Sequence, residues 1–160
     1  MSNQFEEIEC CPPFNPSPWD NKKISWDNKM FVKDKVFCVL NMPVNFGSAM
    51  TRLMKLLENS KANTPDSLCL SEHTSVWNMN LYLAVDKEVE GTLNTRISGN
   101  FYSKVYEGNF NKTGEWIKDF ESKMKEQGLQ HTKLYMWYTT CPKCAKKYGK
   151  NYTVIIAMLK

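Results

Sequence analysis

The segment from Cys141 to Cys144 carries the sharpest chemical motif of the sequence, two thiols separated by Pro142 and Lys143. Cysteines at this spacing are typical of zinc knuckles, in which thiolates hold a tetrahedral ion. A closed zinc site needs four ligands, and Cys11 in the acidic N-terminal region is the candidate for a third. A redox-active pair of thiols and a purely structural loop are the alternatives, and zinc is the one cofactor for which the sequence offers ligands.

Aromatic side chains are the second group that could do chemistry, because many of them fall in predicted strands. Tyr and Trp suit a binding site, since each combines a large stacking surface with a polar tip. Alternate residues of a strand point to opposite faces, so some rings pack beneath helices and others line a groove. The predicted ligand-binding residues are Trp77, Tyr82, Tyr102, Tyr135 and Trp137.

Glu107 is the first candidate for a catalytic carboxylate. It ends a predicted strand directly before Gly108 and shares a strand face with Phe101 and Val105. A carboxylate among rings can act as a general acid or base, or it can bind a cationic ligand. Glu72 is the second candidate, and the alternative for Glu107 is a solvated strand end.

Composition and charge describe a folded, soluble chain. Its 160 residues suit one domain, and 42% hydrophobic residues exclude disorder. The longest apolar runs fall short of the about 20 residues that a membrane helix needs. The net charge of +4 comes from scattered lysines without a recognition motif, which argues against nucleic acid as a partner. With no basic residue among the first twenty, we expect a cytoplasmic protein without a membrane partner.

Two copies of a strand–helix–strand–strand unit must position these residues. Helices are predicted over 47–61 and 113–127, because each carries apolar residues at helical spacing on one side. The predicted strands span 36–42, 67–71, 80–85, 101–107, 133–139 and 152–158. We therefore predict a body over residues 31–160, with halves 31–90 and 91–160.

Residues 1–30 differ from this body in composition. Four of the seven prolines lie between residues 12 and 18, so this stretch cannot be helix or central strand. It also contains Trp19 and Trp26, which a free tail would not need. We predict an extended arm whose aromatic side chains dock onto the body.

Short motifs in the second half resemble a known superfamily. The string Ile97-Ser98-Gly99-Asn100-Phe101-Tyr102 and the strand end Tyr106-Glu107-Gly108-Asn109-Phe110 are similar to strand entry and exit in the GyrI-like proteins. This resemblance implies an α+β fold, in which duplicated β-α-β-β units form an antiparallel sheet with two helices on one face and a central groove. It also implies binding of a small organic molecule, often flat, apolar or cationic, in that groove.

A second resemblance covers more specific strings. They are Cys11-Pro12-x-Phe14-x-Pro16-x-x-Trp19-Asp20, Pro43-x-Asn45-Phe46-Gly47, and the run from Tyr138 through the paired cysteines to Tyr152. These strings resemble a family of stand-alone prokaryotic proteins that are labelled hydrolase or uncharacterised. Some stand-alone members of the superfamily hydrolyse their ligands with a carboxylate and aromatic residues of the groove.

Three functions of different classes follow from these patterns. The first is binding of a small organic molecule in an aromatic groove, with hydrolysis by Glu107 left open. The second is a zinc-binding or redox module built on Cys141 and Cys144. The third is a protein-binding inhibitor module, and a flat exposed apolar patch would be evidence for it. The sequence does not define the oligomeric state.

Overall fold

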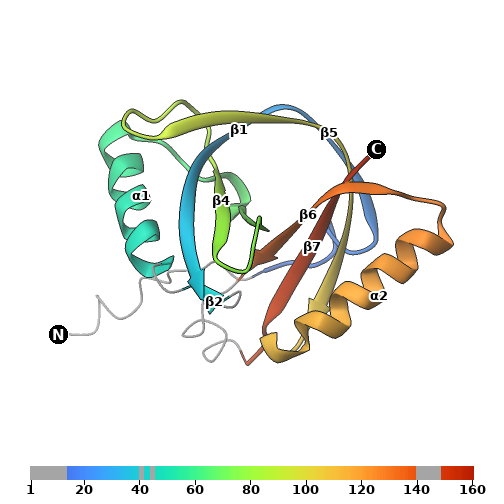
Figure 1. Ribbon diagram of the computed structural model, residues 1–160. Coiled ribbons are helices and arrows are strands. Elements are labelled where there is room, and N and C mark those ends of the chain that lie inside the picture. The colour runs from blue at the N-terminus through green and yellow to red at the C-terminus, as the bar shows by residue number, and fades with distance from the viewer. Residues whose placement is uncertain (1–13, 40–41, 44–45, 140–148) are drawn as a thin grey trace.

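Six antiparallel strands close into a barrel in the computed structural model, which describes residues 14–39, 42–43, 46–139 and 149–160 (Figure 1). The strands are β1 (Lys22–Val39), β3 (Cys69–His73), β4 (Asn78–Ala84), β5 (Leu93–Glu107), β6 (His131–Tyr138) and β7 (Tyr152–Leu159). They are hydrogen-bonded in the order β1-β4-β3-β6-β7-β5, and β5 pairs back onto β1. A two-residue strand, β2 (Met42–Pro43), pairs with the end of β1.

The pairing of β1 with β5 closes the barrel. Residues 22–33 of β1 pair with β5, and residues 31–37 pair with β4, so one long strand joins both of its neighbours. The sequence predicted only the apolar ends of these strands, at 36–42 and 101–107. Their first halves are polar or contain glycine, and they lack the alternation that identifies a strand. Residues 22–30, which the sequence places in the arm, are the first half of β1.

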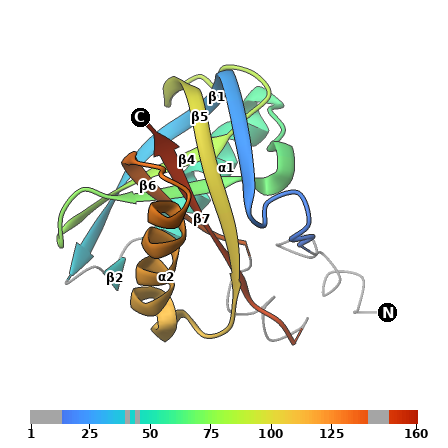
Figure 2. The same cartoon turned by 90° about the vertical axis from the view of Figure 1, so that its right-hand side faces the viewer.

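The two helices cover the outer surface of the barrel from different sides (Figure 1). Helix α1 (Phe46–Ser60) packs Leu53 and Leu57 against the outer faces of β1 and β4. Helix α2 (Thr113–Glu126) packs Phe120 and Met124 against β5, β6 and β7. Figure 2 shows this helix in front of the barrel. Short 3-10 turns, η2 (Pro65–Ser67) and η3 (Phe110–Lys112), precede β3 and α2. Each helix matches its prediction to within one residue.

The observed architecture corrects the expected antiparallel sheet with two helices on one face and a central groove. The α+β class is confirmed, but the sheet closes on itself, so the helices share the outer surface and the space between the two halves is the barrel interior. The order strand–helix–strand–strand occurs twice along the chain. Superposition of the two halves, and membership of the GyrI-like superfamily, stay predictions.

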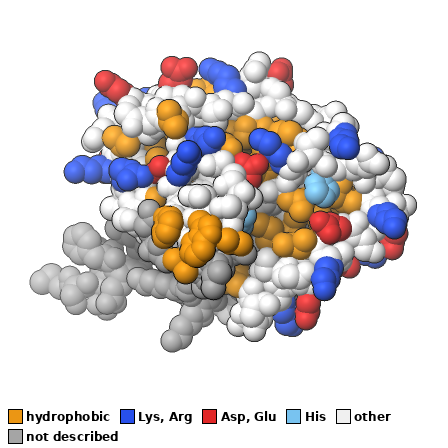
Figure 3. Space-filling model, viewed as in Figure 1, with side chains coloured by type: hydrophobic (Ala, Val, Ile, Leu, Met, Phe, Trp, Pro, Cys, Tyr) orange, Lys and Arg blue, Asp and Glu red, His pale blue; other side chains and the backbone are white. Residues whose placement is uncertain are grey.

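Charged side chains are spread over the surface. Figure 3 shows lysine and arginine interspersed with aspartate and glutamate on one face of the molecule. In the part of the chain that the structure describes, neither helix has the length and apolar character to cross a membrane.

Candidate functional site

Three predicted ligand-binding residues meet inside the barrel. Tyr82 projects from β4, and Tyr135 and Trp137 project from β6, all into the same buried cluster. The rings of Tyr82 and Tyr135 lie 5.9 Å apart, edge to face. All three side chains are at least nine-tenths buried. Because Tyr82 and Tyr135 still carry hydroxyl groups, this apolar interior has polar groups at defined positions.

The carboxylate of Glu72 lies at one end of this aromatic interior. The hydroxyl of Tyr82 donates to Glu72 Oε1 at 3.1 Å, and Asn80 Nδ2 donates to the same oxygen at 3.3 Å. Lys133 Nζ is 3.7 Å from Glu72 Oε2. The side chain of Glu72 is only 14% exposed, so these donors replace most of the water that a carboxylate would otherwise bind.

The strand register explains why these groups meet. Glu72 pairs with Asn80 across β3 and β4, and Leu70 pairs with Tyr82. On the other side, β3 pairs with β6 at Ser71 and Met136, which places Glu72 opposite Tyr135. Residues of one face repeat every second position, so Leu70 and Glu72 both face the interior.

The buried tyrosines keep their protons well above neutral pH. Burial, together with the adjacent carboxylate of Glu72, raises the pKa of Tyr82 to about 12. Burial and the charge of Glu72 also raise the pKa of Tyr135. Both hydroxyl groups are therefore hydrogen-bond donors at physiological pH, and Tyr82 is a fixed donor to Glu72.

Phe14 and Trp19, which precede the first strand, cover Trp137 at the other end of the interior. Trp19 packs edge-on against Trp137 with ring centres 4.9 Å apart, and Phe14 contacts the same ring at 5.3 Å. Trp26, in the first half of β1, lies 4.4 Å from Phe101. Phe14, Trp19 and Trp26 are each partly buried against the interior cluster.

Polar contacts fix residues 19–21 onto β5. The carbonyl of Trp19 accepts a hydrogen bond from Ser103 Oγ at 2.6 Å, and Asp20 Oδ1 accepts one from the backbone N–H of Val105 at 3.2 Å. The hydroxyl of Tyr102 donates to Asn21 Oδ1. This segment thus continues the hydrogen bonding of β5 beyond the point where β1 begins.

Two of the predicted ligand-binding residues lie elsewhere. Tyr102 follows Phe101 and so faces outward, where its ring packs 5.4 Å from Phe120 of α2. Trp77 is in the turn between β3 and β4, and it is 49% exposed. The structure therefore brings together Tyr82, Tyr135 and Trp137 without Tyr102 and Trp77.

Glu107 lies at the opposite end of the barrel from Glu72. It pairs with Tyr152 of β7, whereas Tyr135 pairs with Ile156, so about 13 Å of strand separate the two levels. Its side chain is exposed and borders a surface hollow of about 380 Å³ together with Lys150. Glu107 does not join the buried tyrosines.

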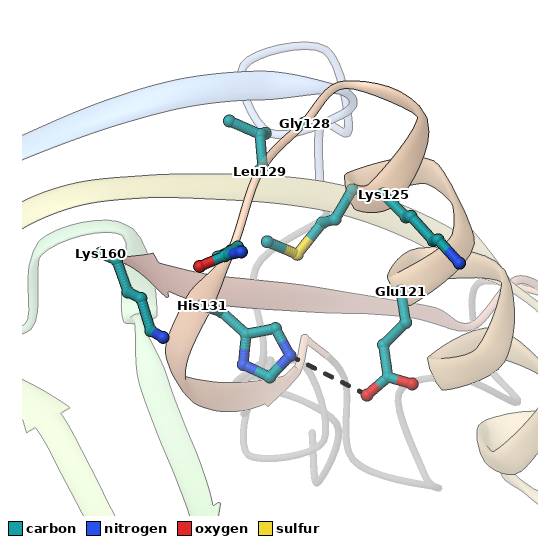
Figure 4. A pocket seen from close by; sticks show the side chains of 8 residues that line it. Glu121, Lys125, Gly128, Leu129, His131 and Lys160 are labelled. Carbon is teal, nitrogen blue, oxygen red and sulfur yellow. Dashed lines mark ion pairs between the residues drawn. The ribbon is translucent and has the colours of Figure 1, made fainter.

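A larger hollow, of about 490 Å³, lies between the end of α2 and the start of β6 (Figure 4). His131 Nε2 is 3.9 Å from Glu121 Oε1, and Lys125 and Lys160 border the same hollow. Figure 4 shows His131 and Glu121 pointing toward one another. These groups form an ion pair at the surface when His131 is protonated, and they lie outside the barrel interior.

The predicted metal site lies outside the described residues, because Cys11, Cys141 and Cys144 fall in the segments 1–13 and 140–148. Within the described ranges, no three histidine, cysteine, aspartate or glutamate side chains gather as a metal site. Cys38 and Cys69 pack in the core between α1 and the barrel, as expected for inert thiols.

The sequence did not identify Asn80 and Lys133 as site residues, and it ranked Glu72 second. The available signal was alternation: Asn80 and Tyr82 share one strand face, and Lys133, Tyr135 and Trp137 share another. Phe14 was part of a recognised motif, but its contact with Trp137 depends on the fold.

Solved structures with this fold span nearly the whole chain. An uncharacterised conserved protein from Listeria innocua matches with a TM-score of 0.66 at 12% identity, covering 99% of this chain and 97% of that one. A hydrolase from Listeria innocua matches with a TM-score of 0.59 at 12% identity, covering 88% and 92%. The C-terminal domain of EcmrR matches with a TM-score of 0.63 at 8% identity, covering 89% and 98%. At these identities the likeness shows the fold alone.

Sequence comparison gives the family directly. Among curated proteins, none matches this chain at a significant level. The model of one protein family, described as bacterial hydrolase, matches residues 1–159, which is all but the last residue. The chain therefore belongs to the bacterial hydrolase family.

Proposed function

We propose that the protein binds a small, flat organic molecule in the aromatic interior of its barrel and hydrolyses it with Glu72 as the general base. The observation that carries this proposal is a carboxylate held at the edge of a buried aromatic cluster by Tyr82, Asn80 and Lys133. Membership of the bacterial hydrolase family supports the hydrolytic step.

The rings suit a flat ligand. Tyr82, Tyr135 and Trp137 offer stacking surface within one cluster, and stacked or edge-on ring pairs gain about 0.5–1.5 kcal/mol beyond the area they bury. Pockets for small organic molecules are mostly apolar and contain a few polar groups that fix orientation. Here the polar groups are the carboxylate of Glu72 and the hydroxyls beside it.

Room for the ligand has to come from side chains that now fill the interior. Tyr135 and Trp137 are held in β6, whereas Phe14 and Trp19 precede the first strand and are only partly buried. Both lie directly on Trp137. We infer that their displacement opens the interior from this end, and that the ligand then reaches the level of Tyr135 and Glu72.

Hydrolysis of an ester illustrates the proposed chemistry. Glu72 Oε2 takes a proton from water as the water oxygen bonds to the carbonyl carbon. The bond to the leaving oxygen then breaks, and the protonated Glu72 returns the proton to that oxygen. Tyr82 and Asn80 hold Oε1, and the proton goes to Oε2, which has only the longer contact of 3.7 Å with Lys133 Nζ. A positioned general base of this kind contributes a factor of about 10²–10⁴ to the rate.

The test uses a neutral pair of naphthalene probes. Binding of 2-acetonaphthone is followed by quenching of tryptophan fluorescence, and hydrolysis of 2-naphthyl acetate is followed by release of 2-naphthol. We expect wild-type protein to bind the first probe and to hydrolyse the second faster than buffer does. Trp137→Leu should weaken binding by about 1–3 kcal/mol, whereas Trp77→Leu on the surface should not.

Glu72→Gln and Glu107→Gln form the matched pair for the catalytic step. Glu72→Gln should reduce hydrolysis by about 10²-fold or more, and Glu107→Gln should leave it within about threefold. The opposite result would move the reaction to the Glu107 end of the barrel. If neither 2-acetonaphthone nor 2-naphthyl acetate binds to folded wild-type protein, this result would contradict the aromatic site itself.

A further inference from the structure

The charges around Glu72 bear on which ligands the barrel accepts. Lys133 Nζ lies 3.7 Å from Glu72 Oε2. Lys33 pairs with Tyr82 across β1 and β4, and its Nζ lies 5.6 Å from the centre of the Tyr82 ring. The ammonium group of Lys133 therefore faces the carboxylate, and that of Lys33 lies over the ring that donates to it. Two positive charges and one negative charge surround Tyr82, so this end of the interior has an excess of positive charge.

Neighbouring residues add to this positive charge. Lys35 pairs with Asn80, which in turn pairs with Glu72, so Lys35 lies on the same face of β1 as Lys33. Asp34, between the two lysines, faces the other side and forms an ion pair with Arg52 of α1. It therefore does not offset the lysines at the barrel end.

The carboxylate of Glu72 also has its donors already in place. Oε1 accepts hydrogen bonds from Tyr82 and Asn80, and Oε2 faces Lys133. A cationic ligand would have to displace Lys133 and would then share this end of the barrel with Lys33, whose Nζ lies over the Tyr82 ring. Like charges at this range repel one another, and the repulsion is stronger in a partly buried site than in water.

We infer that the barrel site discriminates by charge, preferring a ligand that carries an anionic group to one that carries a cation on the same ring, with Lys133 as the selecting residue. This inference rests on the proposed function, because it names the ligand class of the same site. It also fits the proposed reaction, since ester hydrolysis leaves a carboxylate product that Lys133 and Lys33 can bind.

Three naphthalene probes of equal ring size and different charge test this inference. They are 2-naphthoate, 2-acetonaphthone and 2-naphthylmethylammonium, titrated at pH 7.5 and low ionic strength because salt screens such contacts. Dissociation constants come from tryptophan quenching and from calorimetry. We expect 2-naphthoate to bind about tenfold or more tightly than 2-naphthylmethylammonium, which is the effect of one charged contact.

Variants of Lys133 identify the selecting residue. Lys133→Met should weaken 2-naphthoate binding about tenfold and strengthen binding of the ammonium probe, with little effect on neutral 2-acetonaphthone. Lys133→Arg keeps the charge and should keep the preference. Lys55→Met, at an exposed position of α1, is the matched control and should change none of the three constants. Thermal melting of each variant shows that it is folded.

The outcomes separate this inference from the proposed function. Tighter binding of the ammonium probe by wild-type protein overturns the inference and leaves the aromatic site standing. An unchanged preference in folded Lys133→Met overturns the assignment to Lys133. Failure of all three probes to bind overturns the proposed function, and the charge preference falls with it.

Discussion

At the scale of single residues, the contrast between Glu72 and Glu107 decides where chemistry is proposed. Both are strand glutamates on faces that also carry aromatic residues. Glu72 is mostly buried and has two hydrogen-bond donors and a nearby lysine, whereas Glu107 is exposed at the far end of the barrel. A buried carboxylate with hydrogen-bond donors is a candidate for function. Removing a carboxylate from water costs stability, and a functional role explains why such a residue is retained.

The hydroxyl of Tyr82 should matter both to stability and to the proposed reaction. Tyr82→Phe removes a hydrogen bond to a charged acceptor, which typically contributes about 1.5–3 kcal/mol to stability. We expect urea unfolding to show a loss of about this size and 2-naphthyl acetate hydrolysis to slow. Tyr138→Phe is the control, since its ring packs on Phe110. Equal effects of the two substitutions would contradict a specific role for Tyr82.

Two of the six cysteines should resist alkylation in the folded protein. Cys38 is fully buried, and burial raises the pKa of Cys69 to about 12, so neither forms an accessible thiolate at pH 8. Mass spectrometry after treatment with a maleimide should find both unmodified in native protein and modified in denaturant. Rapid labelling of Cys38 or Cys69 in native protein would contradict the packing of α1 on the barrel.

At the scale of elements, the segment that precedes β1 links the barrel interior to the outer surface. Trp19 covers Trp137, while Asn21 accepts a hydrogen bond from Tyr102, whose hydroxyl also accepts one from Gln127 beyond the end of α2 at 3.2 Å. Tyr102 therefore holds together the segment before β1 and the residue that follows α2. An arm over residues 1–30 stays a prediction, and the described contacts concern its residues 14–21 alone.

Trp19→Ala should separate the stabilising role of this segment from its role as a cover. We expect a loss of about 1–3 kcal/mol in the free energy of unfolding, because a partly buried ring leaves the interior cluster. Association of 2-acetonaphthone should become faster, since the route past Trp137 is open. Trp77→Ala removes an exposed tryptophan and is the control. Unchanged stability and unchanged association in Trp19→Ala would show that the segment neither supports nor covers the barrel.

At the scale of the whole molecule, the barrel buries several tyrosines whose protons are hard to remove. Burial and the adjacent Glu72 raise the pKa of Tyr82 to about 12, and burial raises the pKa of Tyr106, Tyr135 and Tyr138 as well. Below about pH 10 the folded and unfolded states both hold these protons, so this contribution to stability is complete. Above pH 10 the unfolded chain releases them first, and unfolding becomes more favourable as the pH rises.

Stability should therefore fall between pH 10 and pH 12. Each such tyrosine should contribute a slope on the order of 1 kcal/mol per pH unit to the free energy of unfolding, measured by urea denaturation. Tyr82→Phe should make the slope shallower, and the same variant at pH 8 provides the reference. An identical slope in wild-type protein and in Tyr82→Phe would contradict the raised pKa of Tyr82.

The sequence by itself determined both helices and at least part of each of the six barrel strands. Helical spacing of apolar residues predicted both helices to within a residue, because one buried stripe is a local property. Aromatic residues in strands predicted an aromatic groove, and Tyr82, Tyr135 and Trp137 meet instead in the barrel interior. Contact of these residues with a ligand stays a prediction. Metal binding or redox chemistry by the thiols of Cys141 and Cys144 stays a prediction as well.

Only the tertiary structure decided closure and orientation. The barrel closes through pairs such as Lys22 with Ser103, which lie far apart along the chain and have no local signal. Which carboxylate faces the interior depends on strand register, since a shift of one residue reverses the face of every side chain. The sequence therefore offered Glu107 and Glu72 as candidates, and the pairing of β3 with β4 and β6 placed Glu72 beside the buried rings.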